Sequence, residues 1–464
     1  MQFGISGKYL VIYYAVLLLV MMSWTDYDSF PPMILRIFYL LAVFAPGLLD
    51  KNGLVPAALT CFWGIAVNGY AYSYMPTQVF LYVGMLVISL FIIHRYDKPV
   101  MAFRGYLLPV VFCLYVSARN LMETTSIENL TWASLLFILF PLFMSDNDAT
   151  NERKMSWAFM VMTSVLSFYC FTTQELFAGQ YGAAGTEMAS RSGWTDPNYL
   201  SMIVGMGAVI GFRNFLRIRR VDRTTAMLSL VAFFMAVPAM LLLVSRGGLL
   251  CLCGGIATLM TFSEIKLKYK VGAVTLIVIF LVILYTNDFL TMLEERMNSD
   301  GGGSNDERLW ILQHRFEAFF DSTPLYWLFG YGMENGMHLG LPYKMGSHND
   351  YVSFMAEYGL VGLMMFLGML ALPLYNMRRD SKVWADIMAY MAYILLACLT
   401  LEPFAFGVWV YYVFLLFIIV VVRSDIARQR SDRNKKGIAA LVEENIDDFK
   451  NTRKENHDRS VEEK

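Results

Sequence analysis

The chain has 464 residues, of which 57% are hydrophobic and only 16% are charged, and its formal net charge is -1. Soluble domains carry about a quarter charged residues, so this composition excludes an ordinary soluble enzyme and favours a protein built from membrane-spanning helices. All six cysteines lie in apolar stretches. They are therefore expected to be small core residues rather than a disulfide framework or a metal knuckle.

Apolar runs of roughly 17–25 residues, the length that crosses a bilayer, recur along the whole chain. The first run follows Lys8 and lacks a small-residue cleavage site, so we interpret it as a span that stays in the protein. The last two runs meet at Glu402-Pro403 and are interpreted as two spans or a broken pair. We expect about 14 spans, at residues 8–23, 32–49, 54–71, 77–94, 103–118, 130–144, 155–175, 198–212, 225–244, 247–263, 271–287, 359–376, 386–402 and 404–422.

Lysine and arginine cluster in alternate connections, a pattern that predicts which loops face the cytoplasm. The loops at 24–31 and 72–76 carry neither residue. With about 14 spans, every basic cluster falls on one side of the membrane. Both termini are therefore expected in the cytoplasm, and the long loop of residues 288–358 is expected outside. That loop is the first place to look for chemistry.

The external loop contains three distinct segments. Residues 305–320 open with Asp306 and Glu307, where a helix start favours acids, and apolar residues then recur at helical spacing: Leu309, Leu312, Phe316, Phe319 and Phe320. This predicts an amphipathic helix lying on the membrane surface or on the bundle. A glycine-rich turn follows at 328–336, and Gly346-Ser-His-Asn-Asp-Tyr351 then leads to Glu357-Tyr-Gly359 and the next span.

These segments resemble the signature of the O-antigen ligase and polymerase superfamily. The resemblance rests on the order Arg308, Trp310, Pro324, Gly330-x-Gly332, His348-Asn349 and Glu357-x-Gly359. Two earlier pieces are similar to the same signature: Arg191-Ser-Gly-Trp-Thr-Asp-Pro-Asn198, with looser spacing, and Ser245-Arg246-Gly247. Together they cover roughly residues 185–375.

The resemblance implies a GT-C-like, all-α membrane bundle that carries out metal-independent, inverting glycosyl transfer without a cofactor. Such enzymes take a glycan from an undecaprenyl diphosphate carrier. They pass it to another carrier-linked repeat unit, which makes polymer, or to a lipid A core acceptor. The implied site faces the periplasmic side of a bacterial inner membrane. Membrane lipids, chain-length regulator proteins and flippase proteins are the expected partners, and nucleic acid is not.

Three domains are expected on this basis. Residues 1–150 would form N-terminal transmembrane helices, residues 151–422 the O-antigen ligase/polymerase-like catalytic membrane domain, and residues 423–464 a charged cytoplasmic tail. Mixed charge and few apolar residues predict that the tail is disordered or loosely helical. Its early basic part is expected near anionic lipid.

A lipid diphosphate leaving group needs a metal or fixed cations, and the planar fork of arginine suits phosphate oxygens. Arg246 and Arg308 match the family's phosphate-binding arginines. The alternatives are an interfacial anchor for Arg246 and a solvated helix face for Arg308. Arg191 either helps to bind the diphosphate or holds its own loop. Arg315, two helical turns beyond Arg308, is expected to be structural.

His348 is the family's candidate base, because an imidazole accepts a proton near neutral pH. The alternative is a hydrogen-bonded structural histidine beside the membrane interface. Asn349 is expected to support His348 or the sugar, and Glu357 to stabilise the local fold. His314 and His338 lack the surrounding motif and are given little weight.

Three rival interpretations remain open. The polymerase and the ligase share this signature, and about 14 spans favour the polymerase mildly. A lipid-linked glycan transporter would show internal repeats and charged spans, and we see no repeat. A metal-dependent glycosyltransferase would centre on Asp26-x-Asp28, which we interpret, like Asp146-x-Asp148, as a polar turn; no metal site is expected.

Overall fold

The structure is a computed structural model that describes twelve ranges of the chain: residues 6–22, 33–49, 107–122, 148–172, 197–217, 223–243, 245–286, 303–342, 346–377, 382–404, 411–429 and 431–434 without 433. Every regular element in these ranges is a helix, and none of them contains a strand. This confirms the all-α prediction for the described part of the chain. The expected spans at 54–71, 77–94 and 130–144 lie outside it.

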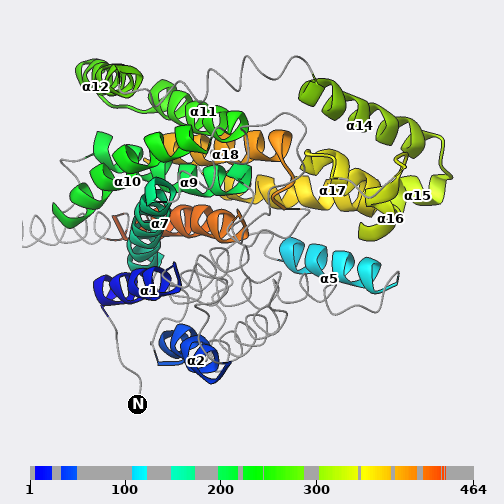
Figure 1. Ribbon diagram of the computed structural model, residues 1–464, viewed down its shortest axis with the longest axis horizontal. Coiled ribbons are helices and arrows are strands. Elements are labelled where there is room, and N and C mark those ends of the chain that lie inside the picture. Colours follow the sequence, from blue (N-terminus) through cyan, green and yellow to red (C-terminus); the bar gives the residue numbers. More distant parts are fainter. Residues whose placement is uncertain are drawn as a thin grey trace, which may run out of the picture.

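The bundle is built around α9 (Figure 1). This helix packs against α7, α10, α11 and α18, and α17 packs against α5 and α18. The short helices of the expected external loop, α14 to α16, lie together at one end of the bundle. The helices are α1 (Gly7–Met22), α2 (Met33–Leu49), α5 (Leu107–Leu121), α7 (Asp148–Thr172), α9 (Pro197–Leu216), α10 (Arg223–Leu242), α11 (Arg246–Phe262), α12 (Leu267–Thr286), α14 (Gly303–Phe320), α15 (Pro324–Phe329), α16 (Met333–His338), α17 (Asp350–Asn376) and α18 (Trp384–Thr400); residues 411–429 form a further helix.

Glycine lets the neighbours of α9 approach closely. A Cβ atom at Gly205 would overlap the Tyr393 hydroxyl of α18, and one at Gly207 would overlap the Thr163 side chain of α7. Small residues at helix crossings allow the backbones to come together where lipid leaves no hydrophobic drive between helices. These two positions therefore explain why α9 is enclosed on several sides.

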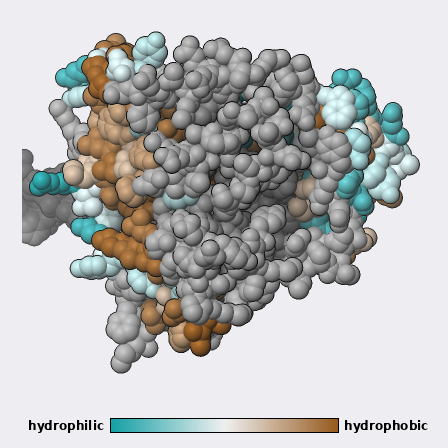
Figure 2. Space-filling view, in the orientation of Figure 1, coloured by the Kyte–Doolittle hydropathy of each residue, from teal (hydrophilic) through white to brown (hydrophobic). Residues whose placement is uncertain are grey.

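Several helices have the length and apolar character of membrane spans. Among the described residues, four qualify by length and composition: Asn198–Leu216, Arg223–Leu242, Leu267–Thr286 and Asp350–Asn376. The third, in α12, has only 11% of its apolar window buried. Figure 2 shows hydrophobic side chains gathered over α1, α10 and α12, whereas hydrophilic ones gather over the end that carries α14 and α15. This distribution fits a protein whose apolar helices are covered by lipid.

Several helix boundaries differ from the sequence prediction; α7, for example, already includes Asp148, whereas that span was expected to start at 155. Helix α17 begins at Asp350, nine residues before the expected span start at 359, and Gly359 interrupts it with φ 66°. The last described helix covers residues 411–429 and so extends beyond the expected end at 422, and Pro403 and Phe404 lie in a turn. The beginning of the expected tail is therefore helical, and Ser424 in it is fully buried.

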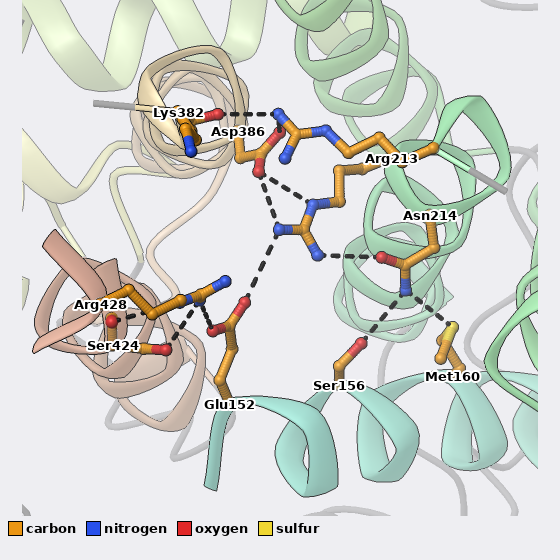
Figure 3. Close-up of polar contacts among 10 residues, drawn as sticks. Glu152, Ser156, Met160, Arg213, Asn214, Lys382, Asp386, Ser424 and Arg428 are labelled. Atoms are coloured by element: carbon orange, nitrogen blue, oxygen red, sulfur yellow. Dashed lines mark hydrogen bonds and ion pairs between the residues drawn. The ribbon is translucent and has the colours of Figure 1, made fainter. Parts of the chain in front are cut away.

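A set of ion pairs lies at the C-terminal end of α9 (Figure 3). Asp386, at the start of α18, lies 2.9 Å from Arg213 and 2.9 Å from Arg217. Glu152 of α7 lies 3.6 Å from Arg213 and also pairs with Arg428 of the last helix. Arg213 and Arg217 fall between the spans expected at 198–212 and 225–244, in one of the basic clusters that predicted the cytoplasmic side. With Arg428, they tie four helices together.

Candidate functional site

Two sequence motifs meet at the C-terminal end of α18. A Cβ atom at Gly247 would lie 3.2 Å from the Thr400 side chain. The Asn349 side-chain amide donates to the Leu399 carbonyl over 3.5 Å, and the Asp350 amide donates to the Leu401 carbonyl over 3.2 Å. Arg246 and His348 are direct neighbours of these residues in the chain. The structure thus brings the two motifs to one helix end.

Arg246 is the first residue of α11. Ser245 caps this helix, because its hydroxyl accepts a hydrogen bond from the Gly248 amide over 3.2 Å. A Cβ atom at Gly248 would overlap the Ser201 hydroxyl of α9, so the turn is held close against the bundle. Arg246 itself is partly exposed. The turn therefore presents a cation at the positive end of a helix, where an anion is favoured.

His348 lies in a tight turn between Ser347 and Asn349. Its φ is 53°, a left-handed conformation that costs about 1–3 kcal/mol for a residue other than glycine. The Ser347 hydroxyl accepts from the Asn349 amide over 3.1 Å and lies 2.7 Å from the Asn349 carbonyl. Asn349 also caps α17, since its side chain accepts from the Val352 amide over 3.2 Å. The capping role of Asn349 is an observed contact, and its expected role beside a sugar remains a prediction.

The two glycine motifs of residues 328–359 form a single contact. The Gly332 amide donates to the Glu357 carbonyl over 2.6 Å. A Cβ atom at Gly330 would overlap the backbone of Glu357, and one at Gly359 would overlap the backbone of Leu328. Both glycines have positive φ, 71° and 66°, a conformation that glycine adopts at little cost. Gly330-x-Gly332 and Glu357-x-Gly359 are thus two halves of one backbone-to-backbone junction.

Helix α5 holds this junction from the N-terminal part of the chain. The Arg119 guanidinium donates to the Phe329 carbonyl over 3.2 Å and to the Gly330 carbonyl over 2.9 Å. The Tyr115 hydroxyl donates to the Tyr358 carbonyl over 2.8 Å. Sequence reasoning missed both residues. Tyr115 lies in the last turn of the span expected at 103–118, and Arg119 follows it directly. Their only indication in the sequence was this position at the span end that was expected to face the outside.

Replacing Gly330 by alanine should destabilise the protein, because the new methyl group meets the Glu357 backbone and the residue keeps a strained positive φ. The strain alone is worth about 1–3 kcal/mol, so we expect a lower apparent Tm, measured by tryptophan fluorescence in detergent. Gly272→Ala is the control, since no atom lies within 4 Å of a Cβ atom built there. Equal Tm values for the two variants would contradict the junction.

The amphipathic helix predicted at 305–320 is present as α14, but its apolar residues face two ways. Phe319 is buried against α17, while Leu309 and Phe320 are 64% and 62% exposed. The helix itself is confirmed, and Phe319 is the one fully buried residue among its five expected apolar positions. The buried stripe instead contains Ile311, Arg315 and Phe319, and Arg308 lies on the same stripe by its helical spacing. Arg308 is only partly exposed, so its alternative as a freely solvated arginine is disfavoured.

Arg315 is fully buried, which the sequence did not predict. Its guanidinium donates to the Met337 carbonyl over 3.2 Å. Burial lowers the pKa of this guanidinium, and the nearby carboxylates of Glu402 and Glu357 act in the opposite direction. Both carboxylates are also buried, at 1% exposure. Arg315 thus provides positive charge for two acids that would otherwise be costly to bury.

Some expected site residues lie outside the described residues. These are Arg191, together with Asp26, Asp28 and Asp146 of the two Asp-x-Asp pairs. Within the described ranges, no group of three His, Cys, Asp or Glu side chains converges in a way that could hold a metal ion.

The described part of the chain is all-helical, and four of its helices are long and apolar enough to cross a membrane. Residues 230–367 match the family model described as O-antigen ligase. This segment contains Arg246, Arg308 and His348, and its match supports the resemblance to the O-antigen ligase and polymerase superfamily. Together with the membrane-capable helices, it supports a glycosyltransferase-like enzyme of the bacterial inner membrane. Arg191, Glu402 and the α5 residues lie outside the match. No curated protein matches the chain.

Proposed function

We propose that the protein is a membrane glycosyltransferase that polymerises undecaprenyl-diphosphate-linked oligosaccharide repeat units into surface polysaccharide. The observation that carries this proposal is the meeting of the Arg246 and His348 turns at the C-terminal end of α18. A cation for the donor and a base for the acceptor are both required for this reaction. Both residues come from the segment that matches the family model.

In the proposed reaction, the acceptor hydroxyl gives its proton to the His348 imidazole as its oxygen attacks the anomeric carbon of the donor. The bond between that carbon and the diphosphate oxygen breaks, and undecaprenyl diphosphate leaves with the bonding electrons. Attack opposite to the leaving group inverts the configuration of the sugar. A positioned base of this kind contributes about 10²–10⁴-fold to the rate.

Arg246 and Arg308 would stabilise the charge on the diphosphate, and Arg191 is proposed as a third donor-binding residue. Fixed guanidinium groups supply this stabilisation without a metal ion. The placement of Arg315 supports the scheme, because it lies beside the buried Glu357 and Glu402. Without a cation near them, these negatively charged carboxylates would disfavour binding of the donor diphosphate.

We infer a GT-C-like bundle of about 14 spans with both termini in the cytoplasm and the site on the periplasmic face. Ser201, beside the Arg246 turn, and Arg213, in the ion-pair set, lie on the same helix α9. Twelve residues of helix separate them by about 18 Å, so the two clusters lie toward opposite ends of the bundle. Arg213 and Arg217 belong to one of the basic clusters from which the cytoplasmic side was predicted.

A ligase is the second candidate, and the description of the matching family favours it directly. In that case the same donor chemistry would transfer the glycan to a lipid A core. Chain-length regulator and flippase proteins are the proposed partners of the polymerase.

Glycan profiling of a deletion strain should separate these functions. Wild-type protein is expected to restore long surface polymer, whereas His348→Ala and Arg308→Ala should leave single repeats. Intact polymer that accumulates on its lipid carrier would instead indicate a ligase. Each variant must be present in the membrane at wild-type abundance. Full-length surface polymer from both variants would overturn the proposed mechanism and favour a transporter.

Chelation of divalent metal should leave the activity unchanged. Because arginines hold the diphosphate in this scheme, we expect the purified protein to elongate a lipid-linked acceptor equally well in excess EDTA and in excess Mg²⁺. The measurement is the initial rate of polymer formation under the two conditions. Loss of the rate in EDTA with recovery on Mg²⁺ would show that a metal centre, not the arginines, carries the charge.

A further inference from the structure

Glu402 follows the C-terminal end of α18 and reaches into the turn that carries His348. Its Oε1 atom accepts hydrogen bonds from the Ser347 amide, the Ser347 hydroxyl and the Ser353 hydroxyl. Glu402, Ser347 and Ser353 are each only 1% exposed. A backbone amide can only donate, so the carboxylate must act as an acceptor here. The side chain that holds the turn therefore comes from a distant part of the sequence.

The turn around His348 needs such support. The positive φ of His348 costs free energy that contacts with the surrounding structure must offset. The Ser347 hydroxyl bridges the turn, because it contacts the Asn349 amide and carbonyl. The two hydroxyls of Ser347 and Ser353 lie 2.7 Å apart. Glu402 thus fixes Ser347, and Ser347 fixes the turn.

The other side of the turn is tied to the same break between helices. The Phe404 amide donates to both carboxylate oxygens of Asp350, over 3.1 and 3.2 Å. Residues 402–404 and residues 347–350 are therefore joined by reciprocal contacts, with an acid from each side accepting from the other. Arg315 supplies the nearby positive charge that makes a buried Glu402 carboxylate tolerable.

We propose that Glu402 is a positioning residue, which holds the Ser347–Asn349 turn so that the His348 imidazole faces the acceptor. The catalytic consequence rests on the proposed function, whereas the positioning of the ring can be tested without it. Glu402→Gln keeps the size of the side chain but removes its charge and one acceptor oxygen. Glu402→Ala removes every contact.

The test combines the chemical reactivity of His348 with turnover. Diethyl pyrocarbonate would be applied to the full-length protein in lipid nanodiscs, and mass spectrometry would give the modification rate of His348 relative to the exposed His338 in the same molecule. We expect Glu402→Gln to change this ratio at least threefold and Glu402→Ala to change it further. Turnover of the lipid-linked donor should fall about tenfold or more, with its KM changed less than threefold.

Glu317→Gln is the matched control, since the same change is made at an exposed residue of α14, and it should alter neither readout. If the Glu402 variants do not fold, Ser353→Ala carries the test, because it removes a single hydroxyl from the network. An unchanged reactivity ratio in a folded variant overturns the positioning role. A changed ratio with unchanged turnover supports it and instead contradicts the proposed role of His348 as the base.

Discussion

Replacing His348 by alanine should lower turnover of the lipid-linked donor by about 10²–10⁴-fold, the usual contribution of a positioned general base. The donor should still bind with a KM close to wild type, because Arg246 and Arg308 are unchanged. The measurement is steady-state polymer formation by purified protein in nanodiscs. The structural reason is the placement of His348 beside the end of α18, next to the turn that carries Arg246.

The control for this variant is His338→Ala, at an exposed position on α16. It removes an imidazole from the same external region without touching the Ser347–Asn349 turn, so activity should remain within about twofold, as expected for an exposed position outside the site. If His348→Ala has wild-type turnover, His348 is not the general base. Loss of activity in His338→Ala alone would place the chemistry on α16.

The motifs of residues 308–359 were recognised from the sequence as a family-like signature. The structure explains the residue types at several of these positions. Gly330 and Gly359 have no side chain because each faces the backbone of the other segment. Asn349 follows His348 because it caps α17. A backbone contact or a helix cap restricts which residue type can occupy a position. These positions could therefore be recognised from the sequence alone.

The partners of the motif could not be predicted, because they depend on contacts between distant segments. Arg315 was expected to be structural, but only the folded structure shows that it is fully buried, with the charges of Glu402 and Glu357 raising its pKa against the effect of burial. Glu402 was noticed only as part of a break between two spans. Arg119 lies directly after the span expected at 103–118 and was given no role. In each case the charged residue is visible in the sequence, whereas its contact partners depend on tertiary packing.

The helices themselves were predicted well where apolar residues fill a whole span. The start of α9 at Pro197 and that of α11 at Arg246 differ by one residue from the expected starts at 198 and 247. Errors appeared where polar residues are buried. Asp350 and Ser353 were assigned to the loop because they are polar, but both lie in a buried part of α17. Their burial is tolerated because they form hydrogen bonds with residues 402–404.

Replacing Asp386 by alanine should cause the largest loss of stability among the substitutions at the ion-pair end. Asp386 is fully buried and pairs with both Arg213 and Arg217. Removing one partner of a buried ion pair costs about 3–5 kcal/mol, because the remaining charge stays buried. We expect a lower apparent Tm and a smaller folded fraction after extraction. Asp386→Asn, which keeps one acceptor and the side-chain size, should fall between alanine and wild type.

The same variant separates stability from chemistry. The ion pairs lie about 18 Å along α9 from the Arg246 turn, so Asp386→Ala should leave turnover per folded molecule within about twofold of wild type. Measuring the rate against the folded fraction, rather than against total protein, makes this comparison. An Asp386→Ala protein with the Tm of wild type would show that the pairs contribute little. A folded variant with strongly reduced turnover would show instead that the two ends of the bundle are energetically coupled, in which case charge at the ion-pair end would influence the site near Arg246.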